Sequence, residues 1–140
     1  EAIENNVRSK IIKEHLNDPA YYEKMSALLD EIIKARKDKA LKYEEYLQKI
    51  FDVVKQVQVG QSDATPQTLN TPGKRALYNN LGQDETLALK IDETVRTVRP
   101  DDWRGVQARE QVIKMALYNI LQDVAEVNQI FEIIKAQTEY

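Results

Sequence analysis

Few residues in this 140-residue chain could carry out chemistry. It has no cysteine and one histidine, His15, which excludes disulfides, thiolate metal sites and any site built on two histidines. Its four glycines are too few for a glycine-rich phosphate loop, and Gly73-Lys74-Arg75 lacks the first glycine and the hydroxyl of a Walker motif. Pro100-Asp101-Asp102 resembles half of a metal-dependent nuclease motif, but no acid-x-lysine triplet follows it. We therefore predict no catalytic residue, metal site or cofactor on this chain.

The most unusual stretch runs from Val95 to Glu110 and holds the only tryptophan among several arginines. Arg109 falls within the apolar arc of a predicted helix, where an unpaired charge is costly. It either pairs with a carboxylate of a neighbouring helix, Asp92 or Glu93, or reaches a partner protein or the DNA backbone. Trp103 either closes the start of a helix as a buried side chain or offers a stacking surface. The candidate partner or DNA contacts are Arg96, Arg99, Trp103, Arg104, Arg109 and Lys114.

The elements that must position these residues are helices, because apolar residues recur at helical spacing and no strand period is found. The predicted fold is an all-α bundle of about six helices without a sheet. Proline, aspartate and threonine mark helix starts at Asp18-Pro19, Thr71-Pro72 and Asp84, and Gly82 marks an end. The predicted helices cover residues 3–16, 20–59, 72–81, 84–98, 101 or 102–121, and a last stretch that includes 127–134.

Residues 20–59 contain neither glycine nor proline, and their apolar positions stay in phase at 100° per residue. This pattern predicts one long helix of about 50 Å or two nearly collinear helices. The polar stretch 36–42 is where a break is expected if there is one. Arg36 lies in the apolar stripe, so the alternatives given for Arg109 apply to it as well.

The chain length favours one domain over residues 1–140, and the polar segment 60–72, with two of the four prolines, is predicted to be an exposed linker. The 20 basic and 23 acidic residues nearly balance, so no overall field draws the chain to nucleic acid or to an anionic membrane. No apolar run approaches the roughly 18 residues that span a bilayer. The chain starts without methionine or a signal peptide. We expect a cytoplasmic fragment of a larger protein.

Two segments carry a family resemblance. The run Leu69 to Leu81 (LNTPGKRALYNNL), followed by Asp101 to Gly105 (DDWRG) and Arg109-Glu110, resembles the C-terminal helical region of type I restriction enzyme R subunits. Tyr22 to Glu31 and Tyr43 to Leu47 are similar to the same region in the same order, so the resemblance covers nearly the whole chain. Gly73 departs from the alanine expected after Pro72.

The resemblance implies a bacterial defence protein that translocates and cleaves DNA with ATP and Mg²⁺, in which nuclease and helicase-like domains precede this helical end. It implies that this region helps to dock the subunit on the methyltransferase and specificity subunits. No position of this sequence matches the family's nuclease or ATPase residues. The sequence thus predicts an assembly domain without chemistry of its own. The alternative is a clamp on the DNA backbone behind the motor, formed by Arg96, Arg99, Arg104 and Lys114.

Overall fold

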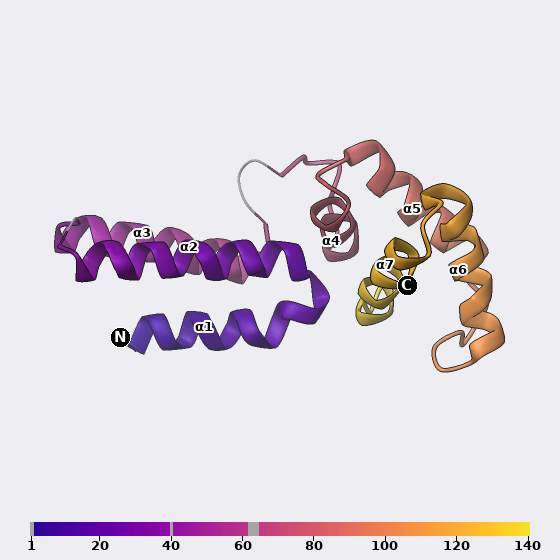
Figure 1. Cartoon of the computed structure of the whole chain (residues 1–140), viewed down its shortest axis with the longest axis horizontal. Helices are drawn as coiled ribbons and strands as arrows, with labels where there is room; N and C mark the ends of the chain where they lie inside the picture. The colour runs from indigo at the N-terminus through magenta and orange to yellow at the C-terminus, as the bar shows by residue number, and fades with distance from the viewer. Residues whose placement is uncertain (1, 40, 62–64) are drawn as a thin grey trace. The chain divides into compact units, whose positions relative to one another are not determined.

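The computed structural model describes residues 2–39, 41–61 and 65–140, and all regular structure in these ranges is helical. Seven α-helices and one short 3₁₀ helix occur there, with no strand in the described ranges. The predicted all-α class is confirmed. The helices belong to two compact units, Glu1–Thr65 and Pro66–Tyr140 (Figure 1). The prediction of a single domain over the whole chain stays a prediction.

The first unit is a bundle of three helices. Asp18 begins the second of them, because its side chain accepts a hydrogen bond from the Tyr21 N–H (3.2 Å) and Pro19 fixes the first turn. Val7, Met25, Leu29, Ile50 and Val53 are among the side chains that fill its core. Its helices are α1 (Ala2–Glu14), α2 (Pro19–Lys37) and α3 (Tyr43–Val59), with the 3₁₀ turn η1 (His15–Asn17) after α1.

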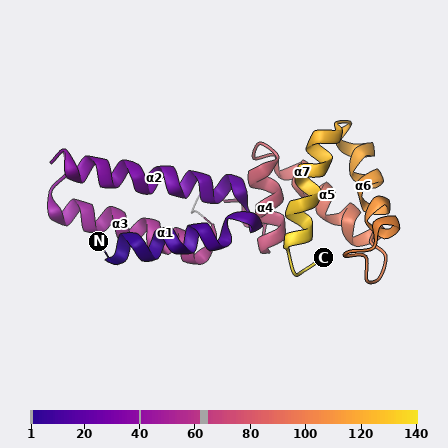
Figure 2. The same cartoon turned by 60° about the horizontal axis from the view of Figure 1, so that its bottom comes forward.

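Residues 20–59 form two helices that lie side by side, so the prediction of one long helix or a collinear pair is wrong. The Tyr21 hydroxyl, at the start of α2, donates to the Gln56 carbonyl near the end of α3 (2.7 Å), which makes the two helices antiparallel. Both views of the chain show this hairpin (Figure 2). The break itself falls where the polar stretch 36–42 predicted it, since α2 ends at Lys37 and α3 begins at Tyr43.

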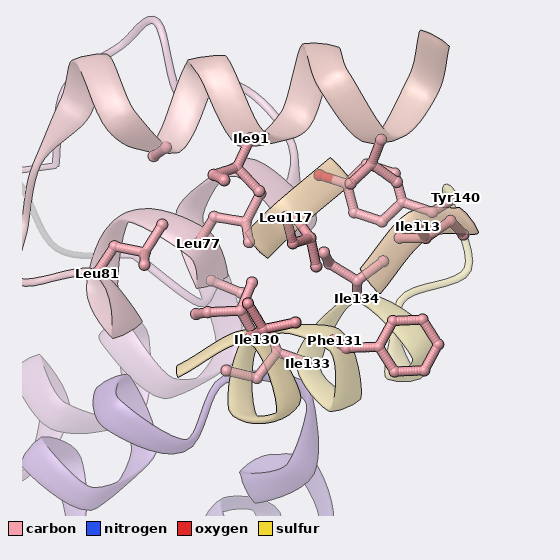
Figure 3. Close-up of a cluster of buried hydrophobic side chains, with 14 of the residues drawn as sticks. Leu77, Leu81, Ile91, Ile113, Leu117, Ile130, Phe131, Ile133, Ile134 and Tyr140 are labelled. Atoms are coloured by element: carbon pink, nitrogen blue, oxygen red, sulfur yellow. The ribbon is translucent and has the colours of Figure 1, made fainter. Parts of the chain in front are cut away.

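The second unit is built from four helices around one apolar core (Figure 3). Thr71, Asp84 and Asp123 each accept a main-chain N–H bond at the start of a helix, as the cap pattern at the first two positions predicted. Side chains from all four helices meet in the core, among them Leu77, Ile91, Leu117 and Ile130. These helices are α4 (Pro72–Asn80), α5 (Glu85–Val98), α6 (Gln107–Leu121) and α7 (Val124–Ala136).

One prediction about loops is wrong, and a second holds only in part. α6 begins at Gln107 and not at Asp101 or Asp102, because left-handed backbone at Asp102 (φ 53°) and Gly105 (φ 78°) turns the chain before the helix. The predicted exposed linker 60–72 is only partly so: its residues 62–64 lie outside the described residues, and Leu69 is 1% exposed. As the one large apolar side chain of that segment, Leu69 gains by joining the core of the second unit.

Candidate functional site

Three of the predicted contact residues, Arg96, Arg99 and Arg104, surround the segment 137–140 that follows α7. Arg99 donates to the Glu139 carbonyl oxygen (3.0 Å). Arg104 donates to the main-chain oxygens of Gln137 (2.5 Å) and Tyr140 (2.7 Å), and a third bond reaches Lys135 (3.3 Å). These arginines come from α5 and from the loop before α6, so they hold the segment from two sides. We call residues 137–140 the tail segment.

Arg96 forms the charged part of the same arrangement. Its guanidinium pairs with the buried Asp92 carboxylate (3.1 Å) one turn earlier and with the Glu139 carboxylate (2.5 Å). It also lies over the Tyr140 ring, 4.8 Å from the centroid. Partial burial works against the charged form of Arg96, but the Asp92 charge and hydrogen bond outweigh it and raise the pKa of the guanidinium.

Tyr140 anchors the tail segment inside the second unit. Its hydroxyl donates to the Asp92 carboxylate (2.5 Å), and its ring belongs to the apolar core. Burial, together with the hydrogen bond to Asp92, raises the pKa of the Tyr140 phenol far above its ordinary value. Asp92 therefore serves both Arg96 and Tyr140, and one buried carboxylate holds α5 and the tail segment together.

Gly73 lies against the same segment at the start of α4. Its N–H donates to the Glu139 carboxylate, which places a negative charge at the positive end of the helix. A Cβ at position 73 would lie 2.5 Å from Glu139 Oε1 and 2.9 Å from the Tyr140 ring. The departure from alanine at this position thus has a structural reason in this chain, because the carboxylate occupies the space of the missing methyl group.

Trp103 is a buried core side chain, 3% exposed, and packs edge-on against Phe131 at 5.7 Å. The Arg104 guanidinium covers its ring at 4.5 Å. The reading of Trp103 as a buried side chain therefore fits better than a stacking surface. Beside it lies a polar pocket of about 540 Å³, whose lining includes Asp101, Asp102 and residues 138–140 of the tail segment.

Arg109 does not pair with Asp92 or Glu93, so the first of its two alternatives is wrong, and its reach to a partner protein or to DNA stays a prediction. Its side chain is exposed and donates to the Asp101 carbonyl (2.9 Å), because the loop that replaces the predicted first turns of α6 brings this carbonyl within reach. The charge pair between helices is made by the next residue: Glu110 accepts from Lys135 (3.0 Å) and from the Gly105 N–H (2.9 Å). The Gly105 N–H bond and then the Lys135 bond lower the pKa of the Glu110 carboxyl.

Lys114 and Arg36 have local contacts of a different kind. The Lys114 ammonium lies 4.8 Å from the Phe131 ring centroid, on the side of α6 that faces α7. Arg36 donates to the Leu41 carbonyl (3.1 Å) and lies over the Tyr43 ring. Arg36 thus stabilises the connection between α2 and α3, and it forms no ion pair in the parts of the chain that the structure describes.

The structure adds two features that the sequence reading missed. One is the tail segment, whose binding depends on residues distant in sequence; its only signal was the isolated aromatic Tyr140 beside an acid. The other is a groove between α6 and α7, of about 370 Å³. Its signal was available, since the helical period placed Met115 and Gln111 opposite the apolar arc of α6.

Among the described residues, no three His, Cys, Asp or Glu side chains gather as a metal site, and no helix is long and apolar enough to cross a bilayer. His15 lies in η1 and contacts the Glu23 carboxylate at 3.4 Å. Comparison of the chain with family models, curated proteins and solved structures gives no match.

Proposed function

We propose that this chain is an assembly module, the C-terminal helical region of a type I restriction enzyme R subunit. In this proposal it docks the subunit on the methyltransferase and specificity subunits of a cytoplasmic restriction complex. It has no catalytic site of its own. DNA translocation and cleavage, with ATP and Mg²⁺, belong to the preceding domains of the parent subunit.

The family part of the proposal depends on the sequence resemblance. The residues on which the resemblance is based have structural roles in this chain. Ala76 and Leu77, from the run that begins at Leu69, are buried in the core of the second unit. Trp103 is buried beside Phe131, and Arg104 binds the tail segment. These residues support a shared fold element more than a shared reaction, because each of them holds helices together.

One observation supports the docking role: in the second unit, these arginines are bound within the chain, whereas several large apolar side chains are exposed. Arg96, Arg99 and Arg104 are engaged by the chain's own carboxylates and main-chain oxygens. The large apolar side chains on α6 and at the start of α7, by contrast, are exposed to water, and exposed apolar side chains that lie together mark interaction surfaces. Those that lie together are Met115, Tyr118 and Val124, which line one groove between α6 and α7.

The alternative, a DNA-backbone clamp, has less support from these contacts. A clamp needs cations that can exchange their partners for phosphates. Three of its four candidate residues would first have to release the tail segment. Arg96 would also leave the buried Asp92 carboxylate without its cation, and a buried charge that loses its partner is costly.

A pull-down against a purified methyltransferase–specificity core tests the docking role, and duplex binding at several salt concentrations tests the clamp. We expect stable capture by the core and no measurable duplex binding at low salt. Each neutralised phosphate makes the slope of log affinity against log salt more negative by about 0.9, so a clamp of four cations would give a slope of about −3.6. Such a slope, without capture by the core, would contradict the docking role.

A further inference from the structure

We propose that the groove between α6 and α7 binds an amphipathic helix of the partner protein, one that carries an acidic residue beside its apolar face. This inference rests on the docking function proposed above, and it names the surface and the chemistry of the partner. The lining of this groove, called here the α6–α7 groove, includes Lys114, Met115 and Tyr118 of α6 and Val124, Val127 and Asn128 of α7.

The first argument is the exposure of the apolar lining. Met115 is 62% exposed, Tyr118 44% and Val124 65%, although the rest of α6 and α7 supplies some of the most deeply buried side chains of the unit. Methionine and aromatic residues are enriched in the centres of protein interfaces, and methionine adapts its shape to irregular partners. The exposed side chains therefore have the composition of a binding surface.

The second argument is the shape of the groove. α6 and α7 are joined by only Gln122 and Asp123, and the Lys135–Glu110 ion pair joins the start of α6 to the end of α7, so the two helices are neighbours along their length. Lining residues on α6 extend from Gln111 to Asn119, which corresponds to about 12 Å or two helical turns. Two rows of side chains on neighbouring helices form a groove, and a row of side chains on a third helix can pack into it. A peptide that binds by adding a strand would need an unpaired strand edge, and the described residues contain no strand.

The third argument is charge. The lining holds one cation, Lys114, three side-chain amides and no carboxylate. Lys114 makes no ion pair within the described residues, and the nearby Glu110 carboxylate is already bound by Gly105 and Lys135. A carboxylate on the partner helix would complement Lys114, whereas a basic helix would be repelled by it. One cation over an apolar floor is poorly suited to a nucleic acid, which needs several.

The test compares variants of the full chain in binding to the methyltransferase–specificity core. Met115→Glu places a negative charge at the centre of the groove, where it would repel the acidic residue of the partner helix and replace an apolar contact. We expect it to weaken binding by about tenfold or more. Lys114→Glu removes the complementary cation, and we expect a loss of severalfold that shrinks as salt is added. Val112→Glu is the matched control, because Val112 is exposed on the same helix but does not line the groove. All three variants should keep wild-type helical circular dichroism.

A second probe separates failure of the groove from failure of the docking function. It is a helical peptide of about four turns with a leucine stripe and one glutamate, compared with its glutamate-to-lysine version. If the core binds all variants equally, the groove is not the docking surface, although docking stands. If the core binds no form of the chain, docking falls, and the groove is then judged by whether the glutamate peptide prefers wild type over Met115→Glu.

Two further results would overturn the proposed occupant. Equal binding of both peptides would remove the acidic partner from the proposal. Self-association in sedimentation equilibrium that Met115→Glu abolishes would show that a second copy of this chain fills the groove.

Discussion

Gly73 is buried at the start of α4, where its N–H donates to the Glu139 carboxylate. In most helix positions glycine is less favourable than alanine, by roughly 1 kcal/mol. Here the order should be reversed, because the alanine methyl group would displace the Glu139 carboxylate and press on the Tyr140 ring. We expect Gly73→Ala to lower the free energy of unfolding by about 1 kcal/mol, the worth of the lost hydrogen bond net of helix propensity.

The control for Gly73→Ala is the same substitution in a Glu139→Ala background, measured by urea unfolding. With the carboxylate gone, the nearest contact of the methyl group is the Tyr140 ring, so the cost of the substitution should fall. The two substitutions should therefore be non-additive, as expected for residues in contact. Equal costs in both backgrounds would mean that Glu139 is not what excludes alanine.

Tyr46 gives the first unit a dependence on alkaline pH. Burial, and then the hydrogen bond to the Glu4 carboxylate, raise the pKa of its phenol from 10.0 to about 12. The folded pKa is higher than the unfolded one, so the stabilising contribution is complete below pH 10 and is lost as pH rises through 12. We expect Tyr46→Phe to lose less stability than wild type across this window, as followed by urea unfolding at each pH.

The matched control for Tyr46→Phe is Tyr43→Phe, since Tyr43 stacks on Tyr46 with ring centroids 6.3 Å apart but is exposed. This variant should show the wild-type loss of stability between pH 10 and pH 12. If Tyr46→Phe lost as much stability as wild type in that window, the Tyr46 phenol would not be the group that carries the effect.

At the scale of elements, the sequence predicts helix starts better than helix partners. A cap is a local event in which a side chain three residues away from an N–H accepts its bond, and this is why Asp18, Thr71 and Asp84 could be read directly. The α2–α3 hairpin could not be predicted in this way, because the apolar positions stay in phase whether the second helix continues the first or folds back on it. The alternative that paired Arg109 with Asp92 or Glu93 failed for a related reason, because it assumed that α6 began at Asp101 or Asp102 and not at Gln107.

The hairpin makes a testable distinction between two neighbours that the helical period places in one apolar stripe. Ile50 is 1% exposed in the core between α2 and α3, whereas Phe51 is 60% exposed. We expect Ile50→Ala to cost about 2–5 kcal/mol of unfolding free energy, through lost burial and a cavity. Phe51→Ala should change it by less than about 1 kcal/mol, because a surface substitution removes little packing.

Urea unfolding of both variants, followed by circular dichroism, measures this difference. A large cost for Phe51→Ala would place that ring in a core and would contradict the hairpin. A small cost for Ile50→Ala would show that Ile50 does not lie in a core, and it would also contradict the hairpin.

At the scale of the whole molecule, the apolar core is divided. The buried cluster of the first unit and that of the second share no residue, and the boundary between the units falls between Thr65 and Pro66. Length and composition predicted one domain, because neither measure shows where apolar side chains meet in space. The single tryptophan makes it possible to measure whether the two units unfold together or separately.

Trp103 is the only tryptophan and lies in the core of the second unit, so its fluorescence reports that unit, whereas circular dichroism reports the helices of both. Leu29 and Leu117 are both 0% exposed, one in each core, and provide matched Leu→Ala substitutions. Each should cost about 2–5 kcal/mol in its own unit.

We expect Leu117→Ala to shift the fluorescence transition in urea. Leu29→Ala should leave the fluorescence transition in place and shift part of the circular dichroism transition. This is expected because each side chain packs in the buried cluster of its own unit, and the two clusters share no residue. If Leu29→Ala moved the fluorescence transition as far as Leu117→Ala does, the chain would unfold as one cooperative domain, as its length alone predicted.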